Sequence, residues 1–258
     1  MYLNKILPFT GICFVLSAGI AFCQDTKKLH DHQHREVTFS VGKTYLQSQN
    51  IEESKPLSLS TGKVIDAEYP HALIAGKNSF LEIHQKNFSS STVIRIGKST
   101  ALEFRSFDSL ALYQGSALLS HRQDLSWKIH STNCQFSTRG SGTWMTEKTE
   151  IGFKFILLEG KITIIGGKKS TEVEAGNLIL INDQEGNISQ TLKIELPLLL
   201  GTSRLLNYFP ETLPSHSRLI SAAQVQALRT KKKYEAMIGG VSKDRQLEVW
   251  QVGKKQEQ

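Results

Sequence analysis

Three histidines at alternate positions, His30, His32 and His34, form the clearest metal-ligand pattern in the sequence. In an extended segment such side chains share one face, and imidazole nitrogens bind Zn²⁺ or Cu²⁺. We find no carboxylate or thiolate clamp that completes the site. We therefore interpret residues 24–36 as a polar leader, keep the three histidines as candidate metal ligands, and expect no cofactor.

Other residues that could support catalysis are poorly placed for it. A jelly-roll metalloenzyme needs a His-x-His pair with a Glu a few residues on. Four further histidines lack that spacing: His71, His84, His121 and His130. Glu172 and Glu174 could suggest glycoside hydrolysis, which uses two carboxylates, but we expect both to face outward. We therefore predict no catalytic residues, and keep a carbohydrate-active enzyme as the second alternative.

The first 23 residues have the pattern of a secretory signal peptide. Lys5 precedes an apolar run at residues 6–22, and charge returns directly afterwards. Ala21 and Cys23 supply the small residues expected before a cut at Gln24. Lipidation of Cys23 and an uncleaved anchor stay open, because the run is close to the roughly 20 residues that span a bilayer. We expect an exported protein of the periplasm, the outer envelope or the exterior.

The composition and charge restrict the class of partner. After removal of residues 1–23 only Cys134 remains, so no intramolecular disulfide forms and we interpret this thiol as a small buried hydrophobe. The formal charge is +7, and the loss of Lys5 leaves +6. Because Lys and Arg are scattered, we expect no nucleic acid partner. A protein, a polysaccharide or an anionic envelope surface fits better.

The pattern of hydrophobic residues predicts the elements. Between residues 37 and 199, short apolar runs alternate with turn residues at roughly ten-residue spacing. We predict a mainly β fold, an antiparallel sandwich or β-roll, with a final strand at residues 192–196. A short helical C-terminal region follows, with a helix at residues 217–237. Its apolar residues are Leu219, Ala222, Val225 and Leu228.

Residues 151–165 show how strands would pair. Strict alternation on both sides of Gly160 predicts a hairpin with Gly160 in its turn. Phe155 and its alternate neighbours would face the core. Ile156 and Leu158 on the other face indicate that this face is covered too.

Four stretches in the centre resemble, in order and spacing, the motifs of the FecR protein domain. They are residues 79–104 with the run Arg95-x-Gly97-x-x-Thr100, residues 110–119, residues 127–145 and residues 155–178. In two places the chain departs from the family pattern: Asn133 replaces a usual proline, and Ser141 and Gly142 stand as an insertion, which we place in a turn.

The resemblance implies a β domain that binds and does not catalyse, since its motifs contain no nucleophile with a base. Regulators of this family carry a cytoplasmic arm that binds a sigma factor. Only residues 1–4 precede Lys5 and the apolar run here, so we expect no such arm.

These observations predict five segments. They are a signal peptide at 1–23, a polar leader and first strands at 24–69, the FecR-like β domain at 70–185, a final strand and linker at 186–214, and a helical, basic extension at 215–258. The predicted function is non-catalytic binding or scaffolding in the envelope or outside the cell. The first alternative is an accessory component of envelope signalling that acts through a protein partner. The sequence identifies no binding residues.

Overall fold

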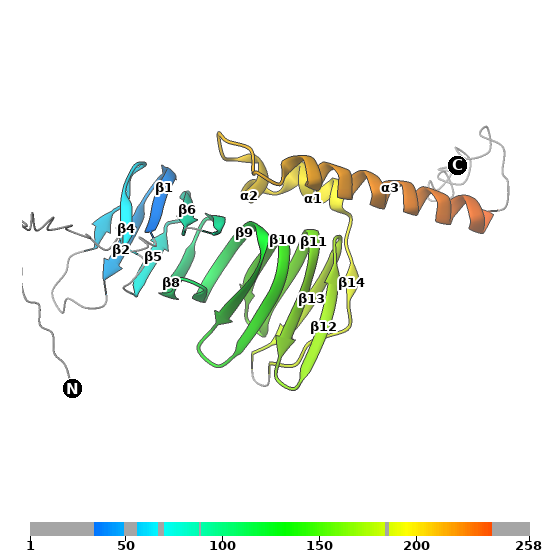
Figure 1. Ribbon diagram of the computed structural model, residues 1–258, viewed down its shortest axis with the longest axis horizontal. Helices are drawn as coiled ribbons and strands as arrows, with labels where there is room; N and C mark the ends of the chain where they lie inside the picture. Colours follow the sequence, from blue (N-terminus) through cyan, green and yellow to red (C-terminus); the bar gives the residue numbers. More distant parts are fainter. Residues whose placement is uncertain (1–33, 49–55, 67–69, 88, 184–185, 239–258) are drawn as a thin grey trace, which may run out of the picture. The chain divides into compact units, whose positions relative to one another are not determined.

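The computed structural model describes residues 34–48, 56–66, 70–87, 89–183 and 186–238. These residues form fourteen strands followed by three helices (Figure 1). Every pair of neighbouring strands is antiparallel. The predicted mainly β fold with a helical C-terminal region is therefore confirmed.

The strands range in length from two residues to 22. They are β1 His34–Val41, β2 Thr44–Ser48, β3 Leu57–Ser58, β4 Val64–Asp66, β5 His71–Ala75, β6 Phe80–Lys86, β7 Ser91–Ile96, β8 Thr100–Ser106, β9 Ser109–His130, β10 Gln135–Thr149, β11 Gly152–Gly166, β12 Lys169–Glu174, β13 Asn177–Asn182 and β14 Leu192–Lys193. The helices are α1 Leu196–Thr202, α2 Arg204–Asn207 and α3 His216–Ile238.

All strands except β12, which pairs with β11, lie along two runs that share β9. One run has the order β14-β13-β11-β10-β9-β7-β6-β1-β4, and in the other β3, β2, β5 and β8 lead to β9. Side chains from both runs meet in one cluster of buried hydrophobic residues, which we call the strand core. Its largest members are Phe104, Trp127, Phe136, Trp144, Phe153 and Phe155.

Alternate side chains of β11 pack into two different hydrophobic clusters. Phe155 lies in the strand core, whereas Ile156 and Leu158 face a second cluster, which we call the helix interface. In this cluster, strand residues pack against residues 196–223 of the helical segment. Figure 1 shows all three helices on one side of strands β9 to β11. The prediction that the second face of this segment is covered is therefore confirmed.

The predicted hairpin at residues 151–165 is wrong, because β11 continues without a break through Gly160. Gly160 lies opposite Gly142 of β10, and a Cβ there would stand 2.2 Å from the Ser141 carbonyl oxygen. Its φ of 91° also favours glycine. The glycines therefore permit close approach of two long strands, and the supposed insertion of Ser141 and Gly142 is part of β10.

The helical segment also corrects one prediction. The final strand is only β14, Leu192–Lys193, and the chain is already helical from Leu196. Pro197 lies in the first turn of α1, where its missing N–H costs no hydrogen bond and its fixed φ suits a helix. The helix predicted at residues 217–237 is confirmed as α3.

Candidate functional site

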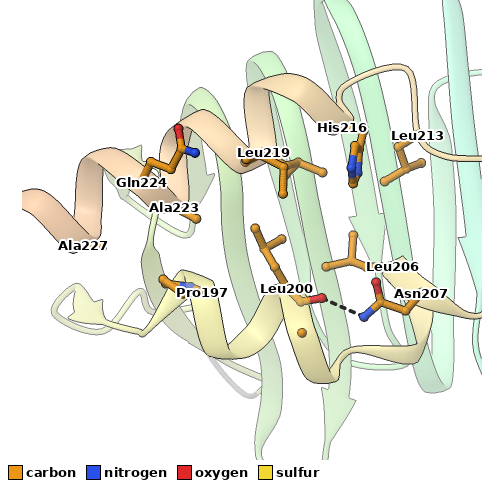
Figure 2. A pocket seen from close by; sticks show the side chains of 12 residues that line it. Pro197, Leu200, Leu206, Asn207, Leu213, His216, Leu219, Ala223, Gln224 and Ala227 are labelled. Carbon is orange, nitrogen blue, oxygen red and sulfur yellow. Dashed lines mark hydrogen bonds between the residues drawn. The ribbon is translucent and has the colours of Figure 1, made fainter.

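The three helices leave a pocket of about 450 Å³ between them, which we call the helix groove. Figure 2 shows α1 and α2 on one side and α3 on the other, with Leu200 and Leu219 directed into the space between them. Most of the lining is apolar. The apolar lining residues are Pro197, Leu200, Leu206, Leu213, Leu219, Ile220, Ala223 and Ala227.

A few polar side chains complete the groove. They belong to Asn207, His216 and Gln224, and no carboxylate is among the lining residues of this described segment. Asn207 Nδ2 donates a hydrogen bond of 2.7 Å to the Leu200 carbonyl oxygen, which ties α2 to α1 (Figure 2). An apolar pocket with a few polar groups has the composition typical of a binding site.

Arg95 of β7 holds α2 and the loop after it on the sheet. Its Nε lies 2.6 Å from Glu82 Oε2 on the neighbouring strand β6. Its other nitrogens donate to the carbonyl oxygens of Leu205 and Leu206 at 3.2 Å and of Glu211 at 2.5 Å. Because the Arg95 and Glu82 side chains are only 1% and 3% exposed, this network fixes one end of the groove.

The ionised form of Glu82 is strongly favoured. Burial alone would raise the pKa of Glu82, but hydrogen bonds with His84, Thr38 and Arg95 outweigh it and lower the pKa to about 2. The Arg95 guanidinium also stacks on the Phe209 ring, 4.3 Å from its centroid. The carboxylate therefore stays charged near neutral pH and keeps Arg95 in place.

A second polar group fixes the start of α3. Arg218 donates two hydrogen bonds, of 2.8 and 3.1 Å, to the carboxylate of Glu159 on β11. One of these carboxylate oxygens also accepts from Thr143 Oγ1 at 3.2 Å. Thr143 Oγ1 also lies 2.7 Å from Ser215 Oγ, which in turn lies 3.0 Å from Ser120 Oγ. These contacts connect three strands to the first turn of α3.

Gln226 ties α3 to the start of α1. Its Oε1 accepts from the Leu196 backbone N–H at 2.8 Å, and its Nε2 donates to the Ile194 carbonyl oxygen at 2.6 Å. A Cβ at Gly176 would stand 2.5 Å from Gln226 Nε2, so glycine leaves room for this contact. Both walls of the groove are thus held by side-chain hydrogen bonds, and the pocket is preformed.

The predicted metal ligands are only partly placed. His30 and His32 lie outside the described residues, and His34 begins β1 opposite Asp66 and Lys86. Within the part of the chain that the structure describes, no group of three or more His, Cys, Asp or Glu side chains could hold a metal ion. The metal site stays a prediction.

Of the remaining candidates for chemistry, His121 and Glu172 have structural partners. The buried His121 accepts from Trp144 Nε1 at 3.4 Å, and burial lowers the pKa of His121. Burial raises the pKa of the Cys134 thiol. Glu172 lies 2.7 Å from Lys161 Nζ on the neighbouring strand, and both side chains of this pair are exposed.

Of the α3 residues that line the groove, only Leu219 was among the apolar residues named for the predicted helix, for a geometric reason. Residues three apart turn by about 60° from one another around a helix, so the chosen spacing drifts off one face. Leu219 is 2% exposed, whereas Val225 and Leu228 are 45% and 59% exposed. Ile220 and Ala227 are seven residues apart, about two helical turns, and so lie on one face of α3. This spacing would have predicted the face that lines the groove.

No protein-family model and no curated protein matches the chain. Two solved structures are similar to it, both described as "Crystal structure of a putative anti-sigma factor from Parabacteroides distasonis ATCC 8503", at 2.50 and 1.65 Å resolution. Each is 12% identical with a TM-score of 0.38, over 52% and 51% of this chain, and the chain spans 65% of the length of each. Assignment to the FecR family stays a prediction.

No helix among the described residues has both the length and the apolar character needed to cross a membrane.

Proposed function

We propose that this is a non-catalytic binding protein of the cell envelope or the exterior, and that its helix groove receives apolar side chains from a protein partner. The observation that carries the proposal is the preformed apolar pocket of about 450 Å³ between α1, α2 and α3. A pocket that exists before binding lowers the ordering cost of association.

The residues around the groove indicate the chemistry of the partner. Ile220 and Leu228 on α3 are 40% and 59% exposed and extend the apolar surface beside the pocket. Arg218 is already paired with Glu159, but the later part of the α3 sequence has four further cationic residues against the single acidic residue Glu235: Arg229, Lys231, Lys232 and Lys233. The matching partner is an amphipathic segment with acidic residues, bound as a helix in a groove.

The two alternatives differ in their support. A carbohydrate-active enzyme needs two carboxylates in one cleft. The helix groove has none, and a second described pocket has only Glu147. An accessory role in envelope signalling would use the same groove. The signalling role rests on the FecR-like motifs of residues 70–185. Unlike scaffolding, it requires that binding of the partner change a signalling output.

Synthetic peptides test the groove directly. Fluorescence anisotropy should show saturable binding of a labelled amphipathic peptide of Leu and Glu to the full chain, and weaker binding of its Lys-for-Glu counterpart. Ala227→Glu places a carboxylate in the groove and should weaken binding of the acidic peptide at least about tenfold. Ser221→Glu adds the same charge to an exposed position of α3 outside the groove, and should have a much smaller effect. Equal losses in both variants, or no binding of the acidic peptide, would contradict the proposal.

Export is tested separately, by mass spectrometry of the mature N-terminus from fractionated cells. A chain that begins at Gln24 supports secretion, and a lipidated Cys23 supports an anchored envelope protein. An intact Met1 in the membrane fraction would indicate a retained anchor, whereas an intact Met1 in the cytosol would contradict export.

A further inference from the structure

A second pocket, of about 270 Å³, lies where α1 and α2 meet the sheet, and we call it the cationic pocket. The sheet side includes Lys98 in the turn after β7 and Lys154 on β11, and the helical side includes Arg204 at the start of α2. One carboxylate, that of Glu147, is also among the lining residues. The pocket thus carries three positive charges against one negative charge.

Two of these cations have no acidic partner among the residues that the structure describes. Lys154 Nζ lies 3.4 Å from Glu147 Oε2, so these two groups neutralise each other. Within the described ranges, no carboxylate forms an ion pair with Lys98 or Arg204. Both of these cations line the pocket and are exposed, so an anion that enters it would be attracted by both.

The pocket also offers hydroxyl groups. Ser116 and Ser203 are both lining residues. Ser203 Oγ has Met145 Sδ as its partner at 3.9 Å, and a thioether is a weak acceptor, so this hydroxyl can donate elsewhere. A Cβ at Gly97 would stand 2.9 Å from Ser116 Oγ, so glycine keeps the space around that hydroxyl open.

We propose that the cationic pocket binds a phosphate group. A phosphate monoester carries about −1.5 to −2 charges at pH 7, which matches the two unpaired cations. The planar guanidinium of Arg204 suits two phosphate oxygens, and Lys98 supplies a point charge. A single carboxylate would leave one of the two cations unbalanced. The phosphate belongs either to a small soluble molecule or to a lipid headgroup.

Titration of inorganic phosphate into the full chain, followed by backbone amide shifts, tests the site. Saturable shifts are expected at Gly97 and Lys98, weakened about tenfold by Lys98→Gln or Arg204→Gln. Lys161→Gln removes an exposed cation outside the pocket and should leave binding unchanged, as should Ala227→Glu in the helix groove. Glu147→Gln should tighten binding, because the only negative charge of the pocket is lost.

Further measurements identify the class of ligand. Acetate at equal concentration should bind more weakly, and an equal response would overturn the assignment to phosphate. Vesicles with phosphatidic acid in phosphatidylcholine distinguish a lipid source. If the protein sediments with these vesicles and Arg204→Gln weakens that sedimentation, the phosphate belongs to a lipid headgroup. If the protein does not sediment with them, the result supports a soluble phosphate. Phosphate shifts that do not saturate, or that survive both pocket substitutions, would overturn the proposal. Because Ala227→Glu acts only on the groove, failure here is distinct from failure of the peptide experiment.

Discussion

The strand core and the helix interface are both buried, but they are built from different kinds of residue. The strand core is a cluster of hydrophobic side chains, and the charged groups that pack on its rings face aromatic carbon. The fully buried Arg35 guanidinium lies 4.1 Å from the Phe104 ring centroid, and Lys148 Nζ lies 5.7 Å from that of Phe153. The helix interface is crossed by buried acidic groups, Glu82 and Glu159, each paired with an arginine.

The two kinds of contact have different roles, because one stabilises the fold and the other positions the helices. Apolar burial is favourable in many arrangements, because the hydrophobic effect has no direction. A buried ion pair contributes little net stability, but its loss is costly, since one partner then stays buried and uncompensated. The strand core therefore supplies most of the stability, whereas the arginine pairs place the helices and so set the shape of the groove.

The largest expected effect comes from the strand core. Phe155 is completely buried in it and stacks on Trp144, with ring centroids 5.1 Å apart. Phe155→Ala should lower the free energy of unfolding by up to about 5 kcal/mol, because it leaves a cavity that the rigid strands cannot close. Urea denaturation followed by tryptophan fluorescence and by circular dichroism should show one earlier, coincident transition. Separate transitions for helices and strands would mean that the strand core does not stabilise the helix interface.

Arg95→Ala should cost almost as much, but through the helices. It leaves the Glu82 carboxylate buried without its guanidinium partner and removes three hydrogen bonds to the helical segment. We expect a loss of about 4 kcal/mol in unfolding free energy. Limited proteolysis should cut faster between residues 203 and 216, while the strands stay protected.

A double variant provides the control for Arg95. In Glu82→Leu with Arg95→Leu no uncompensated charge remains, so it should be more stable than Arg95→Ala alone. Equal stability of the two variants would show that the carbonyl hydrogen bonds, and not the buried charge, are what the interface needs.

Most of the fold was open to prediction, because alternation identifies strands with one buried face. The exceptions come from glycine. A glycine with positive φ suits a tight turn and a close approach of two strands equally well. Gly160 was assigned to a turn, and the structure shows it facing Gly142 on the next strand. That distinction depends on a neighbour 18 residues earlier in the chain, which alternation within one segment does not reveal.

The site was much less predictable. Glu82 and Arg95 stand between hydrophobic residues in β6 and β7, at positions where alternation predicts exposure to solvent. They are buried because residues 205–211, more than 100 positions later, cover that face. The groove likewise depends on how α1 and α3 are placed relative to each other. Contacts between residues far apart in the sequence, such as Leu196 and Gln226, determine this placement.

The stability of the helix interface should depend on pH through Glu82. The pKa of Glu82 is about 2 in the folded chain against an ordinary value of 4.5, so its contribution is present above pH 4.5 and is lost as the pH falls toward 2. A difference of this size corresponds to about 3 kcal/mol. Urea denaturation of the wild type and of Glu82→Gln should converge in unfolding free energy across that range. Curves that stay parallel would mean that Glu82 is not responsible.

The smallest effect is expected at the partly exposed end of the helix interface. Arg218 is 42% exposed while its partner Glu159 is 6% exposed. Arg218→Ala should lower the free energy of unfolding by about 1 kcal/mol. The effect is small because solvent screens the exposed guanidinium, and it is not zero because the Glu159 carboxylate stays buried. Lys161→Ala breaks an ion pair of similar length whose two partners are both exposed, and should leave the thermal midpoint unchanged. If both substitutions lower the midpoint equally, burial of the acidic partner is not what distinguishes the helix interface from the rest of the surface.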